Sequence, residues 1–387
     1  MPFDTDRIAH GVSPPEAKPG APRRVMMIAP HFEEYAYLLA RGLAETCDVT
    51  LVLDVGVLCS EFEGRSLPGA PRVTLRANRF RSVPDLLRLL ADIVRFRPQV
   101  IHWQEPSGLV KAVMAAIVVM LCRPFLTVAL TIHDPVPHSG RDSAIARRLA
   151  PVRRAVRRKV HRIFVHGPSC RDQYLRDYLP HPHRDERVAL TEHGVILAGP
   201  ACPPDPDFRA LMFGRMERYK GLGVLCDAVD QLAAEGYDLP LHLAGRGPEL
   251  DELEERFRSH PAVRVDKRFI AAADLIAMIR AADCVVLPYT GATQSGVLAG
   301  AFGNDRFVVA SRIGGIADIV EDGVNGLLVP PGDAGALARA LHAVAADEGL
   351  RTRLREGARR TAAERLSWSR IAAGMIAEYG TAIGARP

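Results

Sequence analysis

The sequence predicts an α/β protein of two doubly wound, Rossmann-like parallel sheets that face each other across a cleft. Short apolar runs alternate with helical patterns along the whole chain, as they do where crossover helices join parallel strands. A length of 387 residues allows two or three domains, each with its own core. The strongest internal loop signal, Gly194–Pro206, separates two such series and marks a hinge between two domains.

The first series follows a Pro- and Gly-rich arm, residues 1–22, and fills a domain that we place at 23–194. Its apolar runs indicate strands that are buried on both faces, as in a parallel sheet covered by helices. Helices are expected at 35–46 and 83–96. The apolar run 112–122 is too short for a bilayer, which takes about 20 residues, and is expected to form a buried helix. The predicted strands are 25–29, 49–54, 100–103, 126–133 and 162–166.

The second series repeats this plan in a domain that we place at 195–365. Helices are expected at 221–235, 248–259 and 271–282. Ligands of such sheets bind beyond the carboxyl ends of the strands, so two facing sheets would place an active site between the domains. The predicted strands are 210–214, 241–245, 284–289, 306–311 and 326–330.

Composition narrows the class of protein. With 48% apolar and 25% charged residues the chain is typical of a globular protein and unlike a disordered one. Aromatic residues make up 6%, too few for the ring platforms of a lectin or a single-strand nucleic-acid binder. The seven cysteines are scattered singly, which favours a reducing compartment. No apolar leader stands at the start, and we expect a cytoplasmic protein.

Positive charge is concentrated in the first half. Through Val195 the chain has 28 Lys and Arg against 20 Asp and Glu, whereas the remainder has 22 against 25. The segment Arg141–Arg162 holds nine of these cations and one Asp, with an apolar stripe at helical spacing. Its part Arg147–Arg162 suits an anionic membrane, which would put the protein at the inner face of the plasma membrane. A solvated basic face is the equal alternative; a nucleic-acid partner is not expected, because aromatic interleaving is missing.

Two nucleotide-binding motifs are excluded. The first strand ends in Pro30-His31-Phe32 instead of the Gly-x-Gly-x-x-Gly of a dinucleotide site. The nearest match, Gly245-Arg246-Gly247, has Leu250 at the third glycine position, and no Walker loop is found. NAD-dependent and P-loop chemistry are therefore disfavoured.

Two segments at predicted strand ends of the second domain suit a diphosphate. Arg215 and Lys220 follow Gly214 on a loop that opens a helix, and could bind phosphate oxygens as a fork and a point charge. The segment 293–297 offers small residues, hydroxyl donors and a helix start. Taken singly, each has a plain alternative: a solvated basic turn, or ordinary helix capping. Taken together they favour the diphosphate. The second segment comprises Thr293, Gln294, Ser295, Gly296 and Val297.

Polar residues also gather at predicted strand ends of the first domain. The strand ending in His133-Asp134 turns on two prolines, which would hold polar side chains at the rim of a site. We expect a ligand site here, and no metal, because His181, His183 and His193 lack a carboxylate or Cys at ligand spacing. The residues expected at this site, which the resemblance described below assigns to the acceptor side, are His31, Glu34, His102, Asp134 and His138.

The second half resembles the retaining GT-B glycosyltransferases of the "glycosyl transferases group 1" or family 4 type. The similarity covers about residues 160–387 well, and LTIHDPVPHSG in the first half looks like a bacterial polysaccharide-assembly subgroup. Leu366-Ser367-Trp368 is similar to the start of a C-terminal helix, 366–387, that returns to the first domain. The matching motifs, in family order, are EHG (192–194), FGRMERYKG (213–221), HLAGRGPEL (242–250), DKRFI (266–270), AADCVVLPY (281–289), ATQSGV (292–297) and FVVASRIGGIADIVEDGVNGLLVPPGD (307–333).

The resemblance implies transfer of a hexose from a nucleotide diphosphate sugar, of UDP or GDP, to a lipid-linked or saccharide acceptor, without metal or cofactor. It implies that Arg215 and Lys220 bind the donor diphosphate and act in catalysis together with His133, which contacts the transferred sugar. Gly214 and Gly245 belong to the same donor motifs, and Arg268 with Phe269 would hold the base.

The chain departs from the family pattern in two places. The two Glu that the family carries near the donor sugar and the ribose correspond to Ala292 and Gly300. The glycine loop that admits the acceptor corresponds to PHFEEY at 30–35. Three functions follow as hypotheses: a glycosyltransferase acting on a lipid-linked acceptor in bacterial surface polysaccharide or glycolipid synthesis, a catalytically silent nucleotide-sugar-binding scaffold, or a transferase acting on a soluble small molecule.

Overall fold

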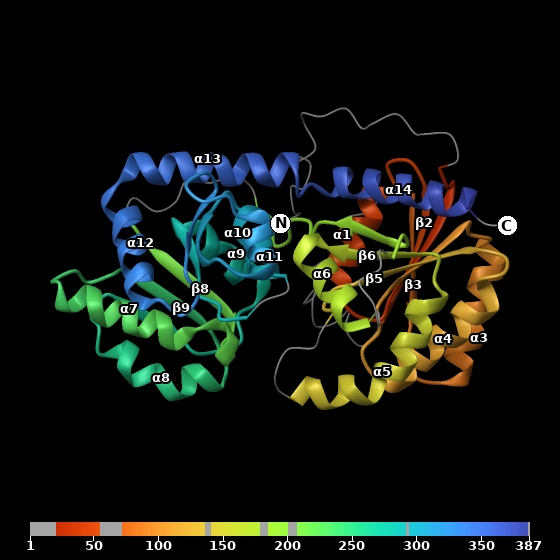
Figure 1. Cartoon of the computed structure of the whole chain (residues 1–387), viewed down its shortest axis with the longest axis horizontal. Helices are drawn as coiled ribbons and strands as arrows, with labels where there is room; N and C mark the ends of the chain where they lie inside the picture. The colour runs from red at the N-terminus through yellow and green to blue at the C-terminus, as the bar shows by residue number, and fades with distance from the viewer. Residues whose placement is uncertain are drawn as a thin grey trace. The chain divides into compact units, whose positions relative to one another are not determined.

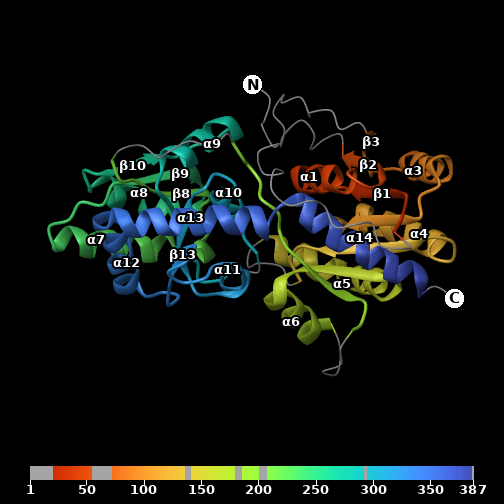
Figure 2. The same ribbon diagram turned by 90° about the horizontal axis from the view of Figure 1, so that it is seen from above.

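The computed structural model describes residues 21–54, 72–135, 141–178, 185–199, 207–291 and 294–385, the side chains of 141–148 excepted. These residues form two compact units (Figures 1 and 2). The N-terminal unit comprises the described residues up to 194 and from 367 on, and the C-terminal unit is Val195–Leu366. Most of the expected N-terminal arm lies outside the described residues.

The N-terminal unit contains a seven-stranded parallel sheet of order β3-β2-β1-β4-β5-β6-β7. The order reverses between β1 and β4, as expected of a doubly wound sheet. Its strands are β1 (Arg24–Ala29), β2 (Asp48–Asp54), β3 (Val73–Asn78), β4 (Val100–Gln104), β5 (Thr127–Ile132), β6 (Arg162–His166) and β7 (Val188–Thr191). Its helices are α1 (Glu33–Leu43), α3 (Val83–Phe96), α4 (Leu109–Cys122), α5 (Arg141–Lys159), α6 (Gly167–Tyr178) and α14 (Trp368–Gly384).

The C-terminal unit contains a six-stranded parallel sheet of order β10-β9-β8-β11-β12-β13. The predicted class, two Rossmann-like α/β domains, is therefore confirmed. Its strands are β8 (Ala210–Arg215), β9 (Leu241–Arg246), β10 (Val263–Asp266), β11 (Cys284–Leu287), β12 (Phe307–Ser311) and β13 (Gly326–Val329). Its helices are η2 (Arg218–Lys220, a 3₁₀ turn), α7 (Leu222–Ala234), α8 (Pro248–Arg258), α9 (Ala272–Ala281), α10 (Gly296–Phe302), α11 (Gly314–Ile319), α12 (Ala334–Ala346) and α13 (Glu348–Glu364).

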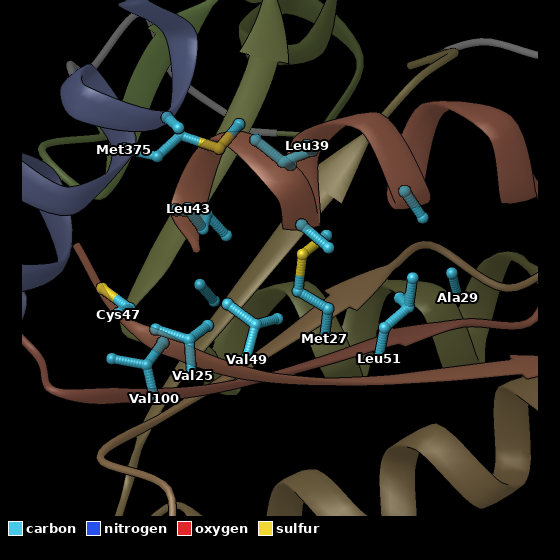
Figure 3. Close-up of a cluster of buried hydrophobic side chains, with 14 of the residues drawn as sticks. Val25, Met27, Ala29, Leu39, Leu43, Cys47, Val49, Leu51, Val100 and Met375 are labelled. Atoms are coloured by element: carbon cyan, nitrogen blue, oxygen red, sulfur yellow. The ribbon is translucent and has the colours of Figure 1, made fainter. Parts of the chain in front are cut away.

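Helices cover both faces of the N-terminal sheet. Alternate residues of β1 point to opposite sides: Val25 and Met27 join a core beneath α1 and α14, whereas Met26 and Ile28 join a core beneath α3, α4 and α5. Figure 3 shows the first of these cores: Val25, Val49 and Leu51 point from the strands toward α1, and Leu39 of α1 lies beside Met375 of α14. This two-sided burial is the reason that central strands could be predicted from apolar runs.

The C-terminal helix packs against the N-terminal unit through positions without side chains. A Cβ atom at Gly42 of α1 would lie 2.6 Å from the Trp368 carbonyl oxygen, and one at Gly194 would lie 2.5 Å from the Trp368 ring. Deeper in the same contact, Tyr379 of α14 hydrogen-bonds His102 of β4. Without a Cβ atom at Gly42, α14 can lie close to α1, and without one at Gly194, the Trp368 ring fits against the segment after β7.

Helix α4 corrects an expectation. We expected residues 112–122 to be buried, but α4 buries only one face, and within that run Met120 and Leu121 each expose more than half of their surface. A helix that is apolar all round does not reveal from sequence which face is covered. No described helix is long and apolar enough to cross a membrane.

Two cations of the expected basic surface on α5 are also placed differently. Arg157 is buried and forms a two-pronged ion pair with Glu105, with N–O distances of 2.7 Å. Arg162, at the start of β6, pairs with Glu378. These partners are 52 and 216 residues away in the sequence, so local patterning could not reveal them. Arg147 and Arg148 have side chains outside the described set.

We predict that Gly42→Ala destabilises the N-terminal unit by about 1–3 kcal/mol, because its Cβ atom would overlap the α14 backbone. The unfolding midpoint in urea, followed by tryptophan fluorescence, measures this unit alone, since both tryptophans of the chain, Trp103 and Trp368, lie in it. Gly374→Ala is the matched control: its Cβ atom would meet nothing within 4 Å, and alanine favours a helix. Equal midpoints for the two variants would contradict the proposed close contact.

Candidate functional site

The loop after β8 is fixed by a close backbone contact. Gly221 has φ 70°, and a Cβ atom there would lie 1.9 Å from the Pro288 carbonyl oxygen, so only glycine fits. The Thr290 N–H donates to the Tyr219 carbonyl at 2.8 Å, which ties the same loop to the segment after β11. The carboxyl ends of β8 and β11 are thereby held together, with Arg215 and Lys220 between them in sequence.

Lys220 is buried although it is charged. Its side chain is 6% exposed, and its ammonium group lies 5.5 Å from the centre of the Tyr289 ring. Burial, and secondly the neighbouring charge of Arg215, lower the pKa of Lys220 to about 8, which Glu217 offsets only in part. Arg215 is exposed at the end of β8, and neither cation forms an ion pair with a described residue.

Gly214 makes room for this ammonium group. A Cβ atom at Gly214 would lie 2.9 Å from Lys220 Nζ, and one at Gly245 would lie 2.0 Å from the Gly214 carbonyl oxygen. Because both positions lack a side chain, β8 and β9 end side by side with Lys220 against them. The two glycines that were expected at the donor site are thus brought together with Lys220.

The segment before α10 has two roles. Ser295 Oγ accepts the Leu298 N–H at 3.2 Å, and this hydroxyl also hydrogen-bonds Tyr289, the ring beside Lys220. The plain alternative, helix capping, therefore holds for Ser295. The side-chain oxygen of Gln294 is buried without a described hydrogen-bond donor. Gly296 and Val297 open α10, while Thr293 lies outside the described residues.

Helix α7 does not offer a free N-terminus to a ligand. The Glu249 carboxylate accepts the N–H groups of Leu222 and Gly223, at 3.2 and 3.1 Å. Arg218, between the two expected phosphate ligands, pairs instead with Glu252 at the surface. Of the positive groups on this loop, Arg215 and Lys220 are left to meet an anion.

The expected base-binding residues lie at the end of the neighbouring strand pair. Phe269 is 59% exposed, and the Arg246 guanidinium lies 5.9 Å from the centre of its ring. Arg268 pairs with Asp274 at 3.2 Å. An exposed aromatic ring beside two arginines suits stacking with a heterocycle.

In the N-terminal unit His133 is the centre of a buried hydrogen-bond chain. Its Nε2 lies 2.8 Å from Gln104 Oε1, and its Nδ1 lies 3.1 Å from His166 Nε2. His133, His166 and His193 are all at most 7% exposed, and Tyr35 packs edge-on against His133 and His166. Both ring nitrogens of His133 are therefore engaged within this unit.

These histidines are neutral at physiological pH. Burial lowers the pKa of His166 to about 3, and it lowers that of His133 far below the ordinary value, with the neighbouring histidines adding to the shift. The pKa of His193 is also lowered by burial. His133 can orient a hydroxyl or polarise a bond, but at neutral pH it brings no positive charge.

Phe32 covers His133. Its ring stacks on the imidazole with centres 4.0 Å apart, and 38% of the side chain remains exposed. Its φ of 60° lies in the left-handed region that favours glycine. The backbone of the PHFEEY loop thus keeps a glycine-like conformation, while a large ring fills the space that glycine would leave open.

The other residues expected on the acceptor side lie in different surroundings. His31 reaches Ser107, with its Nε2 2.6 Å from the hydroxyl, and Asp134 is near enough to keep the pKa values of His166 and His193 from falling further. Glu34 is partly exposed in the first turn of α1. His102 is a correction: it is fully buried in mid-strand, where it hydrogen-bonds Thr131 and Tyr379. His138 lies outside the described residues.

Sequence reasoning missed Gln104, His166 and Tyr35 as partners of His133. The strand register explains why. Gln104 is paired with Thr131 at the ends of β4 and β5, whereas His102 is paired with Ala129 in mid-strand. Comparing the last residue of each neighbouring strand would have selected Gln104 and His166 and rejected His102. No group of metal-ligating side chains is found within the described ranges.

Two family models match this chain, one on each unit. "Glycosyltransferase Family 4" matches residues 32–198, and "Glycosyl transferases group 1" matches residues 207–347. Together they cover most of the chain. The chain belongs to the group 1 and family 4 glycosyltransferases.

Proteins similar in sequence are named as transferases of the same kind. The chain is 36% identical to a D-inositol 3-phosphate glycosyltransferase of Xylanimonas cellulosilytica over 46% of its length, and 35% identical to a phosphatidyl-myo-inositol mannosyltransferase of Mycobacterium leprae over 44%. These matches span 43% and 46% of the two relatives, less than half of each.

Solved structures with the same fold cover nearly the whole chain. The Anabaena protein HepE in complex with UDP-glucose has a TM-score of 0.66 at 18% identity, covering 92% of this chain and 98% of HepE. Sucrose-phosphate synthase from Thermosynechococcus elongatus has a TM-score of 0.69 at 19% identity, covering 91% and 97%. The fold is GT-B.

One departure from the family pattern is built into the packing. Gly300, where the family carries a Glu, is buried in α10. A Cβ atom there would lie 3.4 Å from Leu197, 3.7 Å from Phe213 and 3.9 Å from Ile279. These three nearest side chains are apolar and offer a carboxylate no charged partner. The second position, Ala292, lies outside the described residues.

We predict that Gly300→Glu, which restores the family's residue, destabilises the C-terminal unit by about 3–5 kcal/mol, because a carboxylate would be buried without a partner. Calorimetric unfolding measures the loss. Gly374→Glu, a glycine of α14 with nothing within 4 Å of its Cβ position, is the control and is expected to change little. An unchanged transition with tighter UDP binding in Gly300→Glu would show that the carboxylate reaches a ligand instead.

Proposed function

We propose that this protein is a retaining glycosyltransferase that moves a hexose from a nucleotide diphosphate sugar to a lipid-linked acceptor, in bacterial surface polysaccharide or glycolipid synthesis. The main support for a nucleotide diphosphate donor is Lys220, a buried ammonium group beside Arg215. Neither of these two side chains pairs with a described carboxylate. A buried cation without a counter-ion is costly, and a diphosphate would supply the missing charge. The nucleotide is a UDP or GDP sugar.

In this proposal the two cations act on the leaving group. Breaking the bond between the sugar and the diphosphate builds negative charge on the phosphate oxygens, and Lys220, held in a low-dielectric position, stabilises that charge more than an exposed cation would. Arg215 adds a forked donor from the end of β8. No metal or cofactor is required for this step, because the two side chains supply the positive charge.

Further contacts would hold the rest of the donor. The Phe269 ring with Arg246 and Arg268 is our proposal for the base, and the unpartnered Gln294 oxygen for a hydroxyl group. His133 would contact the transferred sugar as a neutral hydrogen-bonding group, after one of its bonds to Gln104 or His166 opens.

The names of two similar proteins bear on the acceptor, and the first of them supports a lipid-linked one. One is named for a phospholipid, phosphatidyl-myo-inositol, and the other for a soluble phosphate, D-inositol 3-phosphate. We infer that the protein works in the cytoplasm as a peripheral protein of the inner membrane face. A transferase acting on a soluble small molecule is the variant of this proposal that the second name favours.

A second candidate has its own observations. The bonded nitrogens of His133, the Phe32 ring over its face and the apolar surroundings of Gly300 would all suit a silent protein that binds a nucleotide sugar as a scaffold. Incubation with UDP-, GDP- and dTDP-sugars, with and without polyprenyl-phosphate acceptors, separates the candidates. Sugar transfer or slow donor hydrolysis that His133→Ala abolishes supports the enzyme, whereas donor binding without turnover supports the scaffold.

We predict that Arg215→Ala and Lys220→Ala each weaken UDP binding about 30-fold or more, because each removes a charged hydrogen bond worth about 2–3 kcal/mol. Isothermal titration with UDP measures the dissociation constants. Arg218→Ala is the matched control: it lies on the same loop but pairs with Glu252, and we expect a change below about twofold. Unaltered UDP binding in the Arg215 and Lys220 variants would reject this donor site.

We also predict that UDP binding weakens as the pH rises above about 8. The pKa of Lys220 in the free protein is lowered to about 8, and a bound diphosphate would favour the protonated ammonium and raise it. Below this pH Lys220 is already protonated, so affinity is level; above it, binding must take up a proton and weakens by up to about tenfold per pH unit. Titrations from pH 7 to 9.5 test this, with Lys220→Met expected to remove the dependence.

A further inference from the structure

Most exposed apolar side chains of this protein lie together on one surface. Among the residues that the structure describes, ten of the fourteen exposed large apolar side chains belong to α3, α4 and the turn after α4. These helices lie side by side on one face of the N-terminal sheet (Figures 1 and 2), where their other sides share one buried core. We call this surface the α3–α4 face. It comprises Val83, Leu87, Val94, Leu109, Val110, Val113, Ile117, Met120, Leu121 and Phe125.

The exposed residues of α4 form a continuous stripe. At 100° per residue, the six from Leu109 to Leu121 fall within an arc of about 120°. No charged residue falls within that arc, and Phe125 extends it with 75% of its side chain exposed. Scattered apolar residues are ordinary on a protein surface, but a contiguous patch of this kind marks an interaction surface.

Uncompensated positive charge surrounds the stripe. Exposed arginines stand at both ends of α3 and at the end of α4, whereas each acidic residue between 79 and 126 is engaged. Asp85 caps α3 through Ser82, Asp92 pairs with Arg76, and Glu105 is buried with Arg157. The exposed arginines are Arg79, Arg81, Arg88, Arg95, Arg97 and Arg123, of which Arg88 pairs with Asp85 at 3.3 Å.

We propose that the α3–α4 face docks on an anionic lipid bilayer. The apolar stripe would enter the boundary between headgroups and acyl chains, while the surrounding arginines meet lipid phosphates. A second copy of this chain fits less well, because a two-fold contact would bring the two arginine rims together. Helix α5, where we expected a membrane surface, has exposed Arg154 and Arg158 but no exposed large apolar side chain among its described residues.

This surface deepens the proposed function and rests on it, because it names the part of the chain through which a peripheral protein would meet the membrane. Docking itself requires neither donor nor acceptor. Its failure would leave UDP binding untouched, and a failure of the donor site would leave vesicle binding untouched. The two proposals can therefore be rejected separately.

Flotation of the full chain with vesicles tests the proposal. We expect binding to vesicles of equal parts phosphatidylcholine and phosphatidylglycerol, weaker binding to phosphatidylcholine alone, and weakening by salt. Met120→Glu with Phe125→Glu should lower the partition coefficient about tenfold or more, since two anchors become charged. Arg95→Gln and Arg123→Gln should each lower it about fivefold.

Three controls keep the result interpretable. Leu190→Glu places the same charge at another exposed apolar position of the N-terminal unit and should leave vesicle binding unchanged. Tryptophan fluorescence must give parent-like urea midpoints for every variant, because both tryptophans lie in this unit. Arg154→Gln with Arg158→Gln should retain binding; loss of binding only in this variant would assign docking to α5 and overturn the proposal.

Absence of vesicle binding by the parent chain would also overturn it. A dimer detected by light scattering, which Met120→Glu with Phe125→Glu dissociates while vesicles are not bound, would assign the face to a second copy instead. Equal binding to neutral and anionic vesicles would reject the role of the arginines and with it the proposed partner.

Discussion

The C-terminal unit is organised around one buried charge. Lys220 is an ammonium group removed from water with no described carboxylate partner, and several features of the surrounding chain make that placement possible. Gly214 leaves the space for Nζ, Gly221 lets the loop lie against Pro288, and the Tyr289 ring faces the cation. A structure that needed only a stable loop would pair or expose this lysine. The uncompensated charge therefore indicates an anionic ligand more strongly than any motif of the loop.

The candidate residues of the two units differ in charge. In the C-terminal unit Lys220 and Arg215 present positive charge, whereas in the N-terminal unit burial keeps His133, His166 and His193 neutral. Neutral imidazoles both donate and accept hydrogen bonds, which suits hydroxyl-rich ligands, and cations suit a diphosphate. In the proposed reaction, the cations would thus stand where negative charge develops on the leaving diphosphate. The Phe32 ring covers one face of His133, and both of its nitrogens are bonded, so a hydrogen bond to a sugar requires the bond to Gln104 or to His166 to open.

A structural feature could be predicted from the sequence when the interaction that determines it was local. Central strands were predictable because burial on both faces leaves a continuous apolar run, whereas edge strand β3, with four exposed positions in a row, leaves none. Arg215 and Lys220 were found because a strand end and a loop lie next to each other in sequence. His102 was misplaced by two residues of register, and Arg157 was misread because its partner Glu105 lies on another strand end. Helix α4 was misjudged because its apolar residues surround the whole helix.

The structure divides the surplus cations of the first half into two groups, those that are paired within the fold and those that are exposed. Some serve the fold itself: Arg157 binds Glu105, Arg162 binds Glu378, and Arg187 donates to the last carbonyls of α5. Charges used in this way are desolvated and paired, and they attract nothing from outside. Apart from Arg88, which pairs with Asp85, the exposed arginines around α3 and α4 form no ion pair with a described residue. They border an apolar surface whose exposure to water is unfavourable. A net charge counted along the sequence cannot separate these two groups. The ion pairs do so, and they favour α3 and α4 over α5 as the proposed membrane surface.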